Sequence, residues 1–153
     1  MALYLVQHGK NNPKDQDPEQ QLSPRGREEA ERIGRAASRA GITISSIQHS
    51  PKARARETAE IFASQLSPAN GIREREGIKA LDDVLAVAPE LETANNLMLV
   101  GHLPFMEKLC TYLVAGYQEP TVLAFQNAGI VCLDQDEEAG NWRILWTLMP
   151  SVV

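Results

Sequence analysis

The chain has 153 residues, of which 43% are hydrophobic and 23% are charged, and its formal net charge at pH 7 is -5. This size and composition suit one compact domain with a sizeable core, so we expect a single domain over residues 1–153. The acidic balance argues against a nucleic-acid-binding or anionic-membrane-binding protein, since both classes usually carry a basic excess.

The first nine residues, MALYLVQHG, lack a basic segment and contain too short an apolar stretch for a signal peptide. No later run is long enough to span a bilayer, so we expect a cytoplasmic protein. Cys110 and Cys132 each lie in an apolar run without metal-ligand spacing, and both are expected to be reduced core residues.

The first elements in chain order are a strand over residues 2–6 and a polar, proline-containing loop over 8–22. Ser23 followed by Pro24 predicts the start of a helix, because the Ser oxygen caps free N–H groups and Pro has no N–H to satisfy. Gly41 is expected to end this helix.

A second strand is predicted over residues 44–49, and Ser50-Pro51 is expected to begin the next helix. Arg54 would then lie in the first turn of that helix. A short strand is expected around Ile72. A helix is then expected to contain apolar side chains at helical spacing and to end near a proline: Leu81, Val84, Leu85, Ala88 and Pro89.

The run NLMLVG, residues 96–101, is continuously apolar, which is typical of a central parallel strand buried on both faces. A helix with Phe105 and Leu109 facing inward follows it. Residues 129–135 and 142–148 flank a turn-forming segment and predict an antiparallel hairpin. Together these elements predict an α/β fold: a three-layer α/β/α sandwich with a mostly parallel central sheet and an antiparallel C-terminal edge hairpin.

Three polar residues are expected at the carboxyl ends of the strands, where open α/β sheets bind their ligands. His8 follows the first strand, Arg54 opens the helix after the second, and His102 follows the central apolar strand. Two imidazoles and a guanidinium in one crevice favour an oxyanion ligand, because their N–H groups match phosphate oxygens. A neutral imidazole can also attack phosphorus and carry the phosphoryl group.

Other interpretations remain open for each residue taken alone. A metal site would use two histidines, but it would normally need a third ligand and would gain nothing from Arg54. Either histidine alone is more often structural than catalytic. His49, which also ends a predicted strand, is expected to make local hydrogen bonds. Arg54 has basic neighbours in the sequence, so it alone also fits a solvated basic face: Lys52, Arg56 and Arg75.

Four segments in the order LVQHGK, LSPRG, HSPKARARET and LVGHLP resemble the histidine phosphatase superfamily, and the short SixA-type phosphohistidine phosphatases in particular. The resemblance spans nearly the whole chain and extends to FQNAGIVCLD. It implies that His8 is the phosphorylated nucleophile, that Arg54 of the SPxxRAxxT pattern binds phosphoryl oxygens, and that His102 is the second histidine of the pocket. Gln7, Gly9 and Lys10 are the expected substrate-binding residues, and no metal or other cofactor is implied.

The chain departs from the family at one important position. The family motif begins Arg-His-Gly, whereas this chain has Gln7 before His8. A Gln amide donates a hydrogen bond but brings no charge, so the substitution is expected to slow catalysis. Two compensations are open: Lys10 could supply the charge, or the substrate could itself be positively charged.

The resemblance and the short chain favour a metal-independent phosphatase that acts on phosphohistidine in a protein or on a similar phosphoryl compound with a good leaving group, because a protonated imidazole leaves phosphorus easily. Asp82 or Asp83 is the expected source of any general acid. One alternative is a pseudophosphatase that binds phosphate or a phosphoprotein without turnover. Another is a phosphatase of small phosphate esters. A phosphorylated protein or a small phosphorylated molecule is therefore the expected partner.

Overall fold

The computed structural model describes residues 2–91 and 95–153, and its six strands form one sheet in the order β3-β2-β4-β1-β5-β6. The four strands from β3 to β1 are parallel, whereas β5 and β6 are antiparallel to their neighbours. The strands are β1 (Ala2–Gln7), β2 (Ser46–His49), β3 (Ile72–Glu74), β4 (Leu97–Gly101), β5 (Ile130–Gln135) and β6 (Trp142–Leu148). The predicted mostly parallel sheet with an antiparallel edge hairpin is confirmed.

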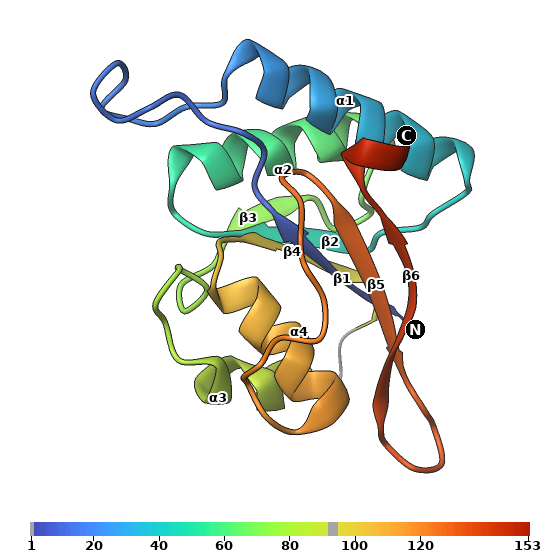
Figure 1. Ribbon diagram of the computed structural model, residues 1–153. Coiled ribbons are helices and arrows are strands. Elements are labelled where there is room, and N and C mark those ends of the chain that lie inside the picture. Colours follow the sequence, from blue (N-terminus) through green and yellow to red (C-terminus); the bar gives the residue numbers. More distant parts are fainter. Residues whose placement is uncertain (1, 92–94) are drawn as a thin grey trace.

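Helices cover both faces of this sheet, as Figure 1 shows, with one pair above it and the other helices below. The upper layer contains α1 (Pro24–Arg39) and α2 (Ala53–Leu66). The lower layer contains α3 (Val84–Val87), the 3-10 turn η1 (Ala88–Leu91) and α4 (Phe105–Ala115), and a C-terminal 3-10 turn, η2 (Pro150–Val152), lies against α1. The expected three-layer arrangement is therefore confirmed.

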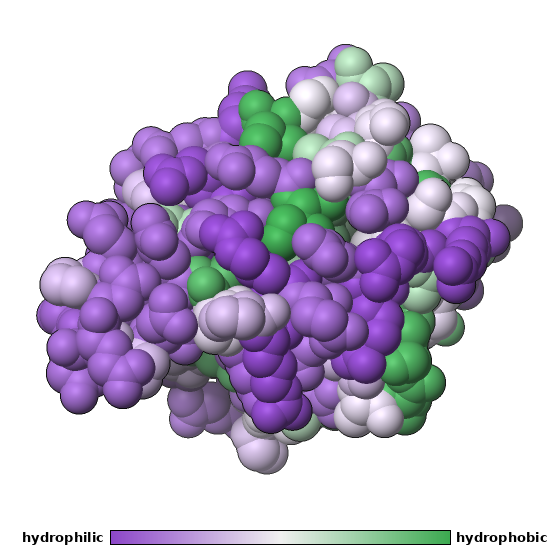
Figure 2. Space-filling model, turned by 90° about the horizontal axis from the view of Figure 1, so that it is seen from above, coloured by the Kyte–Doolittle hydropathy of each residue, from purple (hydrophilic) through white to green (hydrophobic). Residues whose placement is uncertain are grey.

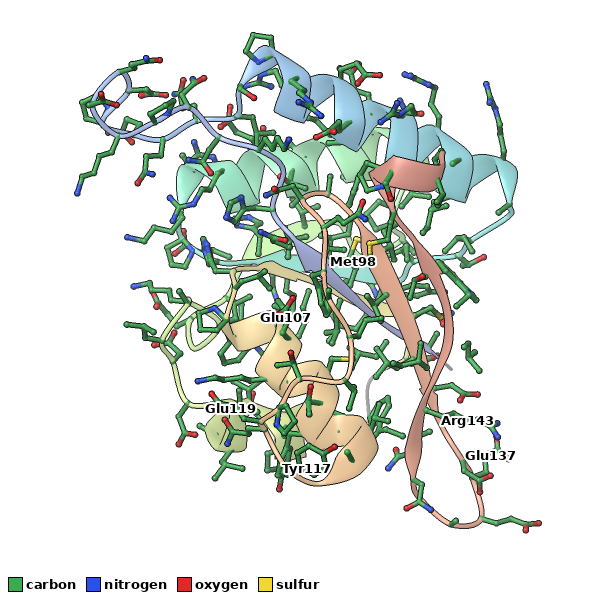
Figure 3. All side chains as sticks on the ribbon, viewed as in Figure 1. Met98, Glu107, Tyr117, Glu119, Glu137 and Arg143 are labelled. Atoms are coloured by element: carbon green, nitrogen blue, oxygen red, sulfur yellow. The ribbon has the colours of Figure 1, made fainter. Side chains whose placement is uncertain are left out.

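The core has one half on each side of the sheet because successive side chains of a strand point to opposite faces. In β1, Leu3 and Leu5 pack on the α4 side, whereas Tyr4 and Val6 pack on the side of α1 and α2. Met98 of β4, labelled in Figure 3, is fully buried in the α1 and α2 half. Viewed from above, the outer face of that helical layer is mainly hydrophilic (Figure 2).

The two long helices begin differently. Ser23 caps α1 as predicted, since its hydroxyl oxygen accepts a hydrogen bond from the Gly26 N–H at 3.0 Å. The predicted start of α2 at Ser50-Pro51 is wrong by two or three residues, because α2 begins at Ala53. The Ser50 hydroxyl bonds to His102 and accepts only a long bond from Lys52 N.

The predicted helix through Leu81 is shorter than expected. Leu81 is 89% exposed and lies before α3, which begins at Val84. Asp83 causes this late start, because its side chain caps the helix by accepting a hydrogen bond from Leu85 N. Pro89 lies in η1, where the chain has left the α-helical geometry.

No helix within the described ranges has the length and apolar character needed to cross a membrane.

Candidate active site

Three parallel strands bring the predicted site residues to one edge of the sheet. β2, β4 and β1 are adjacent, and Gln7 is paired with Gly101 at their carboxyl ends. The backbone continues this pairing past the strand ends, since His8 N donates to Gly101 O at 3.0 Å and Ser50 N donates to Val100 O at 3.1 Å. His8, Ser50 and His102 therefore emerge side by side from the sheet.

The His8 ring is held in one tautomer. Its Nδ1 lies 2.7 Å from the Gly9 carbonyl oxygen, which can only accept a hydrogen bond, so Nδ1 carries the proton. Nε2 is then left with a lone pair, which accepts a hydrogen bond from Arg54 Nε at 3.3 Å. Burial is the main reason that the pKa of His8 falls from the ordinary 6.5 to about 4, and the Arg54 charge lowers it further. His8 is therefore neutral at pH 7.

His102 lies beside His8, with 5.0 Å between the two ring centroids. Its Nε2 is 2.6 Å from the buried Ser50 hydroxyl. Burial is the largest cause that lowers the pKa of His102 to about 3, and the neighbouring His8 and Arg54 contribute in the same direction. Both imidazoles are thus neutral at pH 7, and they lie next to the permanent charge of Arg54.

The first turns of α2 fix the position of Arg54 relative to His8. The Thr58 hydroxyl donates to Arg54 O at 2.8 Å and accepts a hydrogen bond from Gly9 N at 2.9 Å. The Gly9 N–H and C=O are therefore both used in positioning His8 and its loop. A substrate contact through Gly9 stays a prediction.

Two cavities adjoin these residues. One, which we call the Arg54 pocket, has a volume of about 300 Å³ and is lined by Lys52, Arg54, Lys79, Ala80, Leu81, Asp82 and His102. The other, which we call the α1 pocket, has a volume of about 490 Å³, and its lining includes Gln7, Lys10, Arg25, Glu29, Arg32 and Asn127.

The structure thus brings His8, Arg54 and His102 together as predicted, but it places Gln7 and Lys10 in the α1 pocket, away from the lining of the Arg54 pocket. Of the two expected acids, Asp82 lines the Arg54 pocket, where its carboxylate accepts a hydrogen bond from Lys79 N at 2.8 Å. Asp83 caps α3 instead.

The sequence did not predict three residues whose hydrogen bonds help to position the site. Ser50 and Thr58 belong to the SPxxRAxxT pattern, so a signal for them was present, and each makes a hydrogen bond to the site. Asn127 Nδ2 donates to the His8 carbonyl at 2.9 Å, and it lies in the FQNAG segment. That segment is held in turn by Glu107 of α4, labelled in Figure 3, whose carboxylate accepts a hydrogen bond from Phe125 N at 2.8 Å.

The remaining histidine and the cysteines lie outside the site. His49 Nδ1 is 2.8 Å from Ser50 O, as expected for local hydrogen bonding. Cys110 and Cys132 are buried and free, and burial raises their pKa values to about 12 and about 11. Across residues 2–91 and 95–153, no group of three His, Cys, Asp or Glu side chains is arranged to hold a metal ion.

The sequence profile of the histidine phosphatase superfamily (branch 1) matches residues 3–82 of the chain. No curated protein matches the sequence significantly.

Solved structures match the whole fold. The structure of the protein histidine phosphatase SixA complexed with tungstate has 22% sequence identity, covers 99% of both chains and gives a TM-score of 0.87. A protein of Agrobacterium tumefaciens that carries the name of a SixA phosphohistidine phosphatase has 24% identity, 97% coverage of both chains and a TM-score of 0.76. A mycobacterial glucosyl-3-phosphoglycerate phosphatase has 16% identity over 95% of this chain and 98% of its own, with a TM-score of 0.72. At these identities the similarity establishes the fold.

Proposed function

Because the chain belongs to the histidine phosphatase superfamily, we propose that it is a metal-independent phosphatase that works through a covalent phosphoryl group on His8. The observation that carries this proposal is the state of the His8 ring, with its proton held on Nδ1 by Gly9 O and its Nε2 lone pair beside the Arg54 guanidinium. This arrangement places a neutral nucleophile next to a cation that binds phosphoryl oxygens.

The reaction has two steps. In the first, His8 Nε2 forms a bond to phosphorus while the bond from phosphorus to the substrate breaks, and the electron pair leaves with the substrate. In the second, water attacks phospho-His8, inorganic phosphate leaves and the His8 lone pair is restored. Arg54 neutralises charge on the phosphoryl oxygens in both steps, and neutral His102 supplies a further N–H donor.

Phosphohistidine in a protein is the proposed substrate. A phosphorylated imidazole with a proton on its second nitrogen leaves phosphorus as a neutral molecule, so it needs little acid catalysis. The Arg54 pocket agrees with this low requirement for acid catalysis. Its acidic lining residue is Asp82, and the Asp82 carboxylate already accepts a hydrogen bond from Lys79 N. The SixA structures named above share the fold that presents such a site.

A pseudophosphatase is the second candidate, and Gln7 is the observation that favours it. Gln7 lines the α1 pocket and brings no charge to the nucleophile, so charge stabilisation at His8 falls mainly to Arg54. The retained His8 nucleophile favours the enzyme, since a module that only binds phosphate has no need of it.

The deciding experiment measures phosphate release from a phosphohistidine peptide with a metal chelator present. The parent protein is compared with His8→Ala and with His8→Asn, whose amide can keep the bond to Gly9 O but cannot attack phosphorus. Release that persists under chelation and disappears in both variants is the expected result. Unchanged release in either variant contradicts the His8 mechanism, and phosphate binding without release in the parent establishes the pseudophosphatase.

p-Nitrophenyl phosphate and an alkyl phosphate are assayed alongside. Turnover of the aryl ester without turnover of the alkyl ester agrees with a site that depends on a good leaving group. Comparable turnover of the two would instead indicate a phosphatase of small esters, with a general acid supplied by the protein.

A further inference from the structure

The α1 pocket is lined by residues that neighbour His8 and His102, yet the steps above do not use it. Asn127 lines this cavity and also donates a hydrogen bond to the His8 carbonyl at 2.9 Å. Gln7 and Leu103, which adjoin His8 and His102 in the chain, line it as well. The α1 pocket therefore borders the backbone that carries His8.

The wall of the α1 pocket is cationic in a protein that is acidic overall. Lys10, Arg25 and Arg32 line it together with one carboxylate, Glu29, whereas the whole chain carries a formal net charge of -5. Cations gathered in a cavity of an acidic protein attract an anion to that cavity.

The pocket is held in place by contacts from three separate segments. Arg32 of α1 donates to Pro150 O of η2 at 3.4 Å. Gln126 is bonded twice to Ser151, once through each side-chain polar atom, at 2.8 and 3.1 Å. The helix, the segment before β5 and the C-terminal turn are thus tied together around the cavity.

Two buried polar atoms in this wall have no hydrogen-bond partner among the residues that the structure describes: Arg32 Nε and Glu29 Oε1. The Glu29 side chain is only 10% exposed, and its other oxygen lies 3.6 Å from Arg25 Nε. Glu29 therefore lies beside Arg25, while Arg32 Nε makes no hydrogen bond and has only a distant ion pair, with Glu28 Oε1 at 3.9 Å, among the residues that the structure describes. Buried polar groups of this kind are usually satisfied by a water molecule or a ligand.

We propose that the α1 pocket is a subsite for a carboxylate of the substrate, bound by Arg25 and Arg32 while the phosphoryl group lies at His8. A guanidinium presents the paired donors that a planar carboxylate accepts. The subsite deepens the proposed function and rests on it for the position of the phosphoryl group. The carboxylate belongs either to an acidic side chain next to a phosphohistidine or to a small phosphorylated acid.

The first test compares three phosphohistidine peptides that differ only in one neighbouring residue, which is Glu, Gln or Lys. The parent should prefer the Glu peptide, and Arg25→Gln and Arg32→Gln should each lower kcat/KM for it by roughly fivefold, with little change for the Gln peptide. Glu29→Gln should act in the opposite direction, because it removes the negative charge from the pocket. Arg39→Gln, an exposed arginine at the end of the same helix, is the matched control and should leave the preference unchanged.

The second test uses phosphonates as inhibitors of p-nitrophenyl phosphate turnover. Phosphonoacetate carries a carboxylate and methylphosphonate does not, so only the former should bind less tightly to Arg32→Gln than to the parent. If the arginine variants discriminate by carboxylate only among the peptides, the carboxylate belongs to a protein substrate. If they discriminate only between the phosphonates, it belongs to a small phosphorylated acid.

The proposed subsite is overturned if, in both tests, the arginine variants affect ligands with a carboxylate and ligands without one equally. Failure of the parent to release phosphate from any phosphohistidine peptide overturns the proposed substrate, but it leaves the subsite to be judged by the phosphonates. If neither substrate is turned over, calorimetric binding of the two phosphonates to the parent and to Arg32→Gln decides the question.

Discussion

The Ser50 hydroxyl and Nε2 of His102 share a hydrogen bond of 2.6 Å. The hydroxyl oxygen also accepts a hydrogen bond from Lys52 N at 3.3 Å. Since His102 is neutral at pH 7, its ring carries one proton, which is on Nδ1 when Ser50 donates and on Nε2 when Ser50 accepts. Ser50 therefore sets which nitrogen of His102 is a donor.

Replacing Ser50 by Ala should lower kcat by roughly tenfold, the equivalent of one ordinary hydrogen bond. The ¹⁵N chemical shifts of the His102 ring should change from a single tautomer to a mixture. Ser64→Ala is the control, because Ser64 is on α2 but its hydroxyl bonds only to Ile61 O. A reduced kcat with an unchanged tautomer would show that Ser50 acts by some other route.

Replacing Gln7 by Arg should raise kcat/KM. One preorganised donor to a developing anion typically contributes on the order of 10²–10³ in rate, so an increase of about tenfold or more is expected even with imperfect placement. Gln21→Arg adds the same charge at an exposed position of the loop that follows β1 and should have little effect. Equal gains in the two variants would point to general electrostatic attraction of the substrate.

Stability should decrease as the pH falls through the acidic range. The pKa of His8 is lowered from 6.5 to about 4 and that of His102 to about 3, so below pH 6.5 the unfolded chain binds more protons than the native protein. The native state is then fully stable above about pH 6.5 and loses stability toward pH 4 and pH 3. His8 alone should contribute on the order of 3 kcal/mol to this loss.

Urea titrations at about pH 7 and about pH 4.5 test this expectation. The free energy of unfolding should depend less steeply on pH in His8→Asn than in the parent, because one buried imidazole has been removed. Identical pH dependence in the two proteins would mean that His8 titrates near its ordinary pKa in the native state.

Gly26 lies where α1 meets the backbone of the loop that carries Lys10. A Cβ added at Gly26 would lie 2.0 Å from Lys10 O, a distance that cannot be relieved without moving one backbone segment. Gly26→Ala should therefore reduce the free energy of unfolding by roughly 2 kcal/mol or more. Circular dichroism during urea titration measures this.

Gly34→Ala in the same helix is the matched control. The added Cβ would lie 3.1 Å from Gln65 Cγ, which belongs to a flexible side chain, and Ala favours a helix more than Gly. Its stability should stay within about 1 kcal/mol of the parent. A similar loss in both variants would show that the cost at Gly26 does not come from the contact with Lys10.

Much of the fold followed from periodicity, because β1 and the apolar run of β4 have the burial patterns that their sequences indicate. The prediction of helix starts was less accurate, because it depends on which hydrogen-bond partner a polar side chain has. Ser50 bonds to a histidine 52 positions away, and a capping Asp83 shortens α3. Apolar periodicity cannot predict a partner 52 positions away, and it does not show which polar residue caps a helix.

The sequence also predicted the central residues of the candidate site, but not the positions of all its expected residues. Polar residues at the ends of parallel strands indicated His8, Arg54 and His102, and the structure brings these three together. Gln7 is the last residue of β1 and Lys10 lies in the loop beyond it, and both line the α1 pocket. The position of that pocket depends on where the loop and α1 lie, which the sequence pattern does not show.

The loop after β1 is fastened at both ends to the helix that carries Arg54. At one end Thr58 holds Gly9 N, and at the other Glu57 accepts a hydrogen bond from Leu22 N at 3.0 Å and also pairs with Arg27. A displacement of α2 would therefore pull on the loop at both ends, and at one end on the residue next to His8. The helix that carries Arg54 thus also anchors the chain that leaves His8, so the spacing of these two side chains depends on a shared set of hydrogen bonds.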